Sequence, residues 1–252
     1  MNIVTISLAY LKARRLNTLL NILLLALGVA TIVLLLLTTT QLDQRMRRDA
    51  QGIDLVVGAK GSPMQVILSS IYHLDVPTGN IPYKQALELS KHRLVKKAIP
   101  LALGDAYKGA RIVGTTPDYL AHYGAQFAAG KGWQKPLEVV IGADVAAKTG
   151  LTLGAKFQGS HGLGDAGDAH EAHPYVVVGV LARSGSVLDR LVLTSVEGVW
   201  AMHADHHEIK DIDDIANQMK DEEKEYTALL IQYASPIAAA MLPRYEIGRA
   251  HV

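Results

Sequence analysis

Histidine is the residue whose number and spacing point most directly to chemistry in this sequence. Ten histidines occur, and three of them share the glycine-rich stretch 159–173 with aspartate and glutamate side chains. Imidazole and carboxylate groups together suit Zn²⁺, Cu²⁺ or Ni²⁺. The stretch therefore predicts a candidate metal site, with zinc as a possible cofactor and three ligands: His161, His170 and His173. The alternative is a solvated loop whose histidines share no role.

No other motif in the sequence suggests catalysis. The glycines and lysine of segment 58–61 (GAKG) have the wrong spacing for a phosphate-binding loop, and no G-x-S-x-G elbow occurs. The absence of cysteine excludes thiolate catalysis, disulfides and zinc sites built on sulfur. A net charge of +1 provides no general attraction for nucleic acid. We therefore expect neither an enzyme nor a nucleic-acid partner, with no catalytic and no cofactor-binding residues.

A long apolar run lies near the N-terminus, well before the histidine-containing stretch. Residues 19–37 contain no charged side chain, and a helix of this length spans about 28 Å, close to the hydrocarbon core of about 30 Å. The run is longer than the apolar part of a signal peptide, and no small-residue cleavage pattern follows it. We expect an uncleaved transmembrane helix over residues 16–42.

Residues 1–15 are predicted to be a cytoplasmic or interfacial amphipathic segment, because residues 3–11 place apolar side chains on one broad side of a helix. The alternative is that they form only the first turns of the spanning helix. Basic clusters stand on both sides of the apolar run, and the cluster before it (Lys12, Arg14 and Arg15) is the nearer one. A cytoplasmic N-terminus is therefore favoured.

Residues 43–235 are predicted to form an extracytoplasmic α+β domain, since strand and helix patterns alternate irregularly. Residues 97–107 and 110–115 predict a hairpin joined at Lys108-Gly109. Residues 226–233 predict one final strand. A solvated helix with a thin apolar edge is predicted from four apolar residues at helical spacing: Ile209, Ile212, Ile215 and Met219.

Four stretches, taken in order, carry a family resemblance. Residues 15–30 (RLNTLLNILLLALGVA) are followed by 54–61 (DLVVGAKG), 139–146 (VVIGADVA) and 176–181 (VVVGVL). The first is similar to the start of the MacB/FtsX-type permeases of ABC transporters, and the others are similar to segments of their periplasmic domain. The sequence up to about residue 240 thus resembles an N-terminal part of such a permease, with a MacB-like fold.

The resemblance implies a membrane subunit that works as a homodimer or heterodimer beside a separate cytoplasmic ABC ATPase, which binds the ATP. It implies a bacterial inner membrane location, contact with membrane lipid, and coupling of ATP hydrolysis to movement of the periplasmic domain. The alternative is a single-span, membrane-anchored extracytoplasmic binding module, with metal as a candidate ligand. Neither the substrate nor the direction of transport follows from the sequence.

The end of the sequence departs from this pattern. Such permeases have three further membrane helices, whereas residues 237–242 are too short to span a bilayer. Segment 246–252 (EIGRAHV) can be encoded by a widely used sequencing-library adapter. We therefore expect residues 236–252 to be a truncated or artefactual tail, and the chain as written to be inactive.

Overall fold

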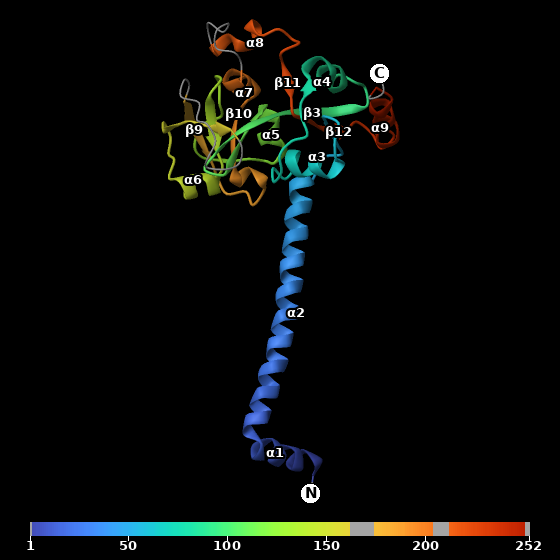
Figure 1. The fold of residues 1–252 in the computed structure, drawn as a ribbon, viewed down its shortest axis with the longest axis vertical. Coiled ribbons are helices and arrows are strands. Elements are labelled where there is room, and N and C mark those ends of the chain that lie inside the picture. Colours follow the sequence, from blue (N-terminus) through green and yellow to red (C-terminus); the bar gives the residue numbers. More distant parts are fainter. Residues whose placement is uncertain (1, 162–173, 204–211, 250–252) are drawn as a thin grey trace. The chain divides into compact units, whose positions relative to one another are not determined.

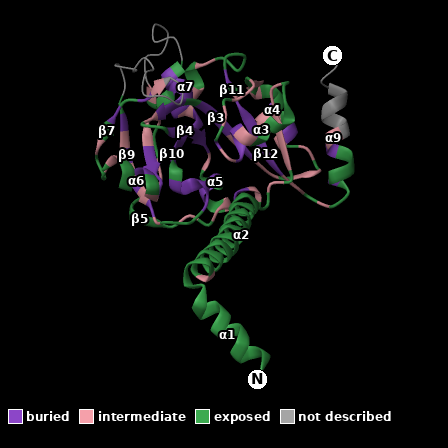
Figure 2. Ribbon diagram, turned by 60° about the horizontal axis from the view of Figure 1, so that its bottom comes forward, coloured by how far each residue is buried: buried purple, intermediate pink, exposed green. Residues whose placement is uncertain are grey.

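The computed structural model describes residues 2–161, 174–203 and 212–249. The chain divides into two units, residues 1–47 and residues 48–252. The first contains helix α1 (Ile3–Ala13) and most of helix α2 (Arg15–Ala50) (Figure 1). Both helices are coloured as exposed along almost their whole length in Figure 2. By length and composition α2 could cross a membrane, and none of its most apolar stretch is buried by protein.

Arg14 separates the two helices. Its backbone (φ −113°, ψ 55°) is not helical, and its guanidinium lies 5.3 Å from the centre of the Tyr10 ring. The prediction that the N-terminal segment is a helix of its own is thereby confirmed. Its place at a membrane interface remains a prediction.

The second unit is built on a mixed sheet, so the predicted α+β class is confirmed. In sheet order, its strands are β1 (Leu55–Gly58), β12 (Ala228–Tyr233), β3 (Val95–Tyr107), β4 (Ala110–Thr115), β10 (Leu191–Ser195), β6 (Glu138–Ile141), β9 (Tyr175–Leu181) and β5 (Phe127–Gly130). Short strand β7 (Lys156–Phe157) pairs with β9, and β8 (Ser160–His161) pairs with β3. A separate ribbon joins β2 (Ile81–Pro82) to β11 (Glu225–Tyr226). Parallel pairing occurs between β10 and β4 and between β6 and β9.

Helices cover this sheet and connect its strands. They are α3 (Pro63–Ser70), α4 (Tyr83–Ser90), α5 (Pro117–His122), α6 (Ala143–Thr149), the 3₁₀ turn η1 (Val187–Arg190), α7 (Val196–His203), the 3₁₀ turn η2 (Ile212–Asp214), α8 (Ile215–Gln218) and α9 (Ala238–Arg249). Successive residues of the central strands enter different cores. On β10, Leu191 and Leu193 join the core that contains Tyr119 of α5, whereas Val192 joins the core that contains Val145 of α6. This alternation is what a sheet buried on both faces requires.

The predicted hairpin is confirmed at its turn. Lys108 and Gly109 both have positive φ (47° and 77°), which is the backbone of a two-residue turn with two left-handed positions. The predicted final strand is interrupted, because Thr227 separates β11 from β12. The hydroxyl oxygen of Thr227 accepts a hydrogen bond from the Leu103 amide at 2.9 Å, and this bond takes the place of a backbone hydrogen bond between the strands.

Two further expectations need correction. Within the described residues, the helix predicted through Ile215 is the 3₁₀ turn η2 followed by the short helix α8, and Ile215 is fully buried instead of forming a thin edge. Ile209, where the prediction began, lies outside the described residues. The two prolines and the Gly-Asn pair of residues 76–82 predict irregular structure, whereas Ile81–Pro82 forms the short strand β2. Helix α5 and strand β5 had no predicted counterpart.

The segment after β12 packs partly against the sheet. Ala238 and Leu242 of α9 are fully buried, and Leu242 lies against Leu229 and Ile231. Residues up to 242 therefore contribute to the core, while the artificial origin of residues 246–252 remains a prediction.

Candidate functional site

Asp49 is the only side chain of α2 that is buried, with 4% of its surface exposed. Its Oδ1 accepts the backbone amide of Val187 at 2.8 Å, and its Oδ2 lies 3.3 Å from Nη2 of Arg190. The same guanidinium nitrogen donates to the Tyr72 carbonyl at 3.1 Å. One carboxylate thus links the last turn of α2 to η1 and to the segment after α3. All of these residues belong to the second unit.

The backbone at the end of α2 is held as well. The Tyr123 hydroxyl donates to the Asp49 carbonyl at 2.6 Å, and Nε2 of His122 donates to the Gln51 carbonyl at 2.9 Å. Nη1 of Arg48 donates to the Gly185 carbonyl at 3.1 Å. The last carbonyls of a helix have no partner within the helix, so the side chains of His122, the last residue of α5, and of Tyr123, which follows it, satisfy groups that would otherwise need water. We call Arg48, Asp49, Tyr123 and Arg190 the α2 anchor.

The loop that receives Asp49 is fixed by a second carboxylate, that of Asp189. Its Oδ1 accepts from the amide and the hydroxyl of Ser184, at 2.8 and 2.9 Å, and its Oδ2 accepts the Gly185 amide at 2.7 Å. The Ser186 hydroxyl caps η1 by accepting the Leu188 amide at 3.3 Å. The loop is therefore organised by its own residues, and Asp49 docks against a rigid surface.

Burial governs the electrostatics of the anchor. Burial raises the pKa of Asp49 above its ordinary value, and the charge of Arg190 and the Val187 amide offset part of this effect. Burial, and then the charge of Asp49, raise the pKa of Tyr123. Tyr123 therefore stays protonated and keeps donating its hydrogen bond at any physiological pH.

A second buried polar group, His73, lies in the same part of the domain. It is 6% exposed, and its Nε2 is 3.0 Å from the hydroxyl oxygen of Tyr119. Burial first, and then the positive charges of Arg111 and Arg190, lower the pKa of His73 to about 3. The imidazole is consequently neutral at physiological pH and packs as part of the core.

The predicted metal ligands are only partly within the described residues. The backbone of His161 lies in β8, directly opposite Asp105 of β3. The side chain of His161 and the whole of His170 and His173 lie outside the described residues. Within the ranges that the structure describes, no group of three or more histidine, aspartate or glutamate side chains could hold a metal ion. The metal site therefore stays a prediction.

One histidine–aspartate pair in the described residues could not be found from the sequence. Nε2 of His203, at the end of α7, lies 3.6 Å from Oδ1 of the buried Asp105. The hydroxyl of Tyr175 is fully buried nearby, and its pKa is raised by burial and then by the charge of Asp105. The three residues stand on α7, β3 and β9, so only the folded sheet brings them together.

A wide groove of about 810 Å³ lies beside strand β1. Strand β1 pairs with β12 on one side, and no strand among the described residues pairs with its other side. The groove is lined mainly by apolar side chains of β1 and α3, including Leu55, Val57, Val66 and Ile67. Such an edge can accept an extended chain through backbone hydrogen bonds.

These features define a class of protein: an α+β domain joined to an apolar helix long enough to span a membrane. The family model of the MacB-like periplasmic core domain matches residues 18–240. The chain therefore belongs to the family of MacB-like periplasmic core domains, which is found in permeases of ABC-type transporters. No curated protein matches the sequence.

Two solved structures are similar in fold. The periplasmic region of MacB from Actinobacillus actinomycetemcomitans is 12% identical, with a TM-score of 0.47, and the match covers 81% of this chain and 88% of that one. The extracellular domain of YknZ, a noncanonic ABC-type transporter from Gram-positive bacteria, is 14% identical with a TM-score of 0.43. That match covers 77% of this chain and 93% of the YknZ chain.

Proposed function

We propose that this chain is part of the membrane subunit of a MacB/FtsX-type ABC transporter. In this proposal a separate cytoplasmic ATPase hydrolyses ATP, and the permease, working as a dimer, converts hydrolysis into movement of its extracytoplasmic domain. The chain itself carries no ATPase function. The proposal rests on the family match over residues 18–240 and extends it to a mechanism.

The α2 anchor is the observation that supports mechanical coupling. Helix α2 runs without a break from Arg15 to Ala50, so its apolar part and its anchored last turn belong to one continuous helix. A helix transmits displacement along its axis only if its end is fixed to the body that it moves. The carboxylate of Asp49 and the carbonyls of Asp49 and Gln51 provide fixed points at that end.

The test uses the intact permease, expressed from its complete gene and purified with the ATPase that copurifies with it. The chain contains no cysteine, and Leu153 is exposed, so Leu153→Cys introduces one accessible thiol for a spin label. We expect ATP with vanadate to change the label-to-label distance in the dimer. Asp49→Ala removes the acceptor for both Val187 and Arg190 and should reduce that change. Asp49→Asn keeps an acceptor for the Val187 amide and is the matched control.

Two results would refute the proposal. One is a purified intact permease that associates with no ATPase. The other is a distance change of equal size in Asp49→Ala and in the parent protein, with complex assembly intact in both. A smaller change in Asp49→Ala than in Asp49→Asn would support the anchor as the coupling point.

Membrane orientation is a second part of the proposal, with the N-terminus in the cytoplasm and the domain outside. Protease added to intact cells, with any outer membrane permeabilised, should leave residues 1–15 uncut and cleave within residues 60–230. The basic cluster at Lys12, Arg14 and Arg15 is the reason for this expectation. The reverse pattern of protection would refute the orientation.

A second candidate function is a membrane-anchored extracytoplasmic binding module, and the groove beside β1 favours it. The edge of β1 that pairs with no described strand, together with the apolar lining, suits an extended apolar peptide. This function predicts peptide binding by the domain in the absence of any ATPase. The permease function instead predicts copurification of an ATPase, so the two readouts separate the candidates.

A further inference from the structure

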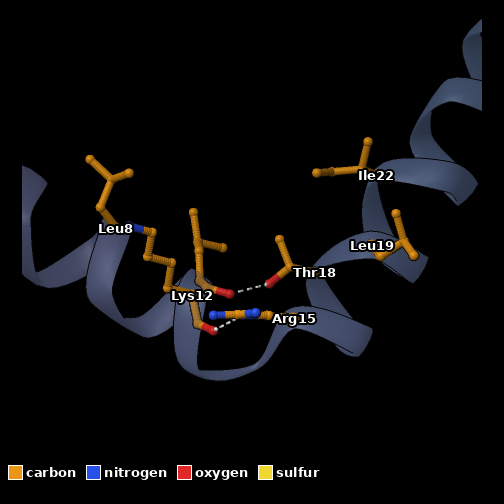
Figure 3. A pocket seen from close by; sticks show the side chains of 7 residues that line it. Leu8, Lys12, Arg15, Thr18, Leu19 and Ile22 are labelled. Carbon is orange, nitrogen blue, oxygen red and sulfur yellow. Dashed lines mark hydrogen bonds between the residues drawn. The ribbon is translucent and has the colours of Figure 1, made fainter.

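Helices α1 and α2 line an open, shallow site of about 370 Å³ within the first unit. Figure 3 shows its lining side chains at the bend between the two helices. The aliphatic wall consists of Leu8, Leu11, Leu19 and Ile22, and two cations, Lys12 and Arg15, line the same site. An apolar wall beside two positive charges is the chemistry of an amphipathic anion.

The bend is held in place by hydrogen bonds between its two sides. Nε of Arg15 donates to the Lys12 carbonyl at 3.3 Å, and the Thr18 hydroxyl donates to the Leu11 carbonyl at 3.1 Å (Figure 3). Because a guanidinium carries five N–H groups, Arg15 keeps its four terminal ones for a ligand. These bonds fix the backbone on which the two cations stand.

The local charge selects an anion. Three basic residues lie close together here (Lys12, Arg14 and Arg15), and the first acidic residue of the chain is Asp43. No carboxylate in the first 42 residues can therefore neutralise these cations. Phosphate groups are a preferred partner of arginine, which can donate two parallel hydrogen bonds to them.

We propose that this bend binds one anionic phospholipid, with its phosphate between Lys12 and Arg15 and an acyl chain along the aliphatic wall. The wall decides between a lipid and a free phosphate, because Leu8 and Leu19 are 55% and 63% exposed and only an apolar group would cover them favourably. The apolar run of α2 begins at Leu19, so the cations stand at the polar end of the apolar segment. The proposal rests on insertion of α2 into a membrane and is independent of ATP-driven movement.

The test measures lipid binding by the full chain in detergent, using native mass spectrometry with phosphatidylglycerol and with phosphatidylcholine. The variant is Lys12→Gln with Arg15→Gln. The control is Arg45→Gln with Arg47→Gln, which removes the same charge from the other end of α2. A basic residue near an anionic membrane contributes about 1 kcal/mol, so the loss of two should weaken phosphatidylglycerol binding about thirty-fold. The control should stay within about two-fold of the parent, and phosphatidylcholine should bind all three proteins equally weakly.

Equal phosphatidylglycerol binding by the parent and by the Lys12/Arg15 variant would overturn the proposal. So would displacement of the lipid by inorganic phosphate at similar concentrations, because it would show a phosphate site that does not use the wall. Leu8→Gln keeps both charges and should weaken lipid binding, so it tests the wall separately. Helix content measured by circular dichroism identifies any variant that fails to fold. Failure of ATP-driven movement in the intact permease would leave these lipid measurements unaffected.

Discussion

Replacing His73 with glutamine should remove a large part of the domain's sensitivity to acid. In the folded domain the pKa of His73 is about 3, whereas the ordinary value is 6.5. Between these values the unfolded chain binds a proton that the folded chain does not. The contribution of His73 to the free energy of unfolding is therefore fully present above about pH 6.5 and is lost as the pH falls toward 3. At pH 5 the loss is about 2 kcal/mol, from 1.5 pKa units at 1.36 kcal/mol each.

The assay is urea denaturation of the full chain in detergent at pH 7.5 and pH 5.0. Fluorescence of Trp133 and Trp200, both in the second unit, follows unfolding of the domain. The free energy of unfolding should fall by about 2 kcal/mol more in the parent than in His73→Gln when the pH is lowered. Comparing differences between two pH values removes any constant destabilisation that the substitution causes.

Tyr119→Phe is the matched control for this experiment. It deletes the hydroxyl that lies 3.0 Å from His73 but leaves the imidazole buried. Since burial is the main cause of the lowered pKa, this variant should keep most of the pH dependence. An unchanged pH dependence in His73→Gln would show that the buried imidazole takes up a proton without unfolding, and the reasoning would then be wrong.

Two further predictions concern the backbone and the metal site. A Cβ on Gly142 would clash with the carbonyl oxygen of Leu188. Gly142→Ala should therefore lower the free energy of unfolding, measured by urea denaturation, by about 2–3 kcal/mol. An unchanged free energy of unfolding would contradict the close approach. If the glycine-rich stretch 159–173 binds Zn²⁺, metal at 100 times its dissociation constant should add about 2.7 kcal/mol to the free energy of unfolding and raise the melting temperature by roughly 5 °C or more. Zinc binding should weaken as the pH falls through about 6.5. An equal melting shift in the triple alanine variant would eliminate these ligands: His161, His170 and His173.

Local sequence patterns were sufficient for elements whose cause is local. The hairpin turn at Lys108-Gly109 and the left-handed Gly150 that ends α6 follow from the residues themselves. Strands β6 and β9 are continuous apolar runs, and both lie inside the sheet, as such runs predict.

Elements shaped by distant contacts were predicted less well. Thr227 looks like an ordinary strand residue, yet its hydroxyl takes the place of a backbone partner for Leu103. Ile215 and Met219 have helical spacing, but burial of Ile215 beside α7 fixes a shorter element. Hydrophobic periodicity shows which residues are apolar, but it does not show which part of the fold will bury them.

The anchor was hidden from sequence reasoning for a related reason. Asp49 lies in a charged stretch that reads as solvated, and Arg190 follows it by 141 positions. Nothing in either neighbourhood signals that the fold places the two charges together. Burial of Asp49 is visible only once α5 and η1 are positioned.

The use of a buried carboxylate at this point fits a joint better than it fits a stabilising core. Apolar side chains of similar volume often stabilise a buried site more than an ion pair does, because removing charge from water is costly. The raised pKa of Asp49 records that cost. The carboxylate instead makes directional contacts. One of its oxygens accepts a hydrogen bond from the Val187 amide, and the other accepts one from the Arg190 guanidinium. An apolar contact would permit the end of α2 to rotate or slide against η1, whereas directional hydrogen bonds resist both motions. The proposed function, in which α2 passes movement to the domain, requires that resistance, and the α2 anchor lies at the last turn, where it would be needed.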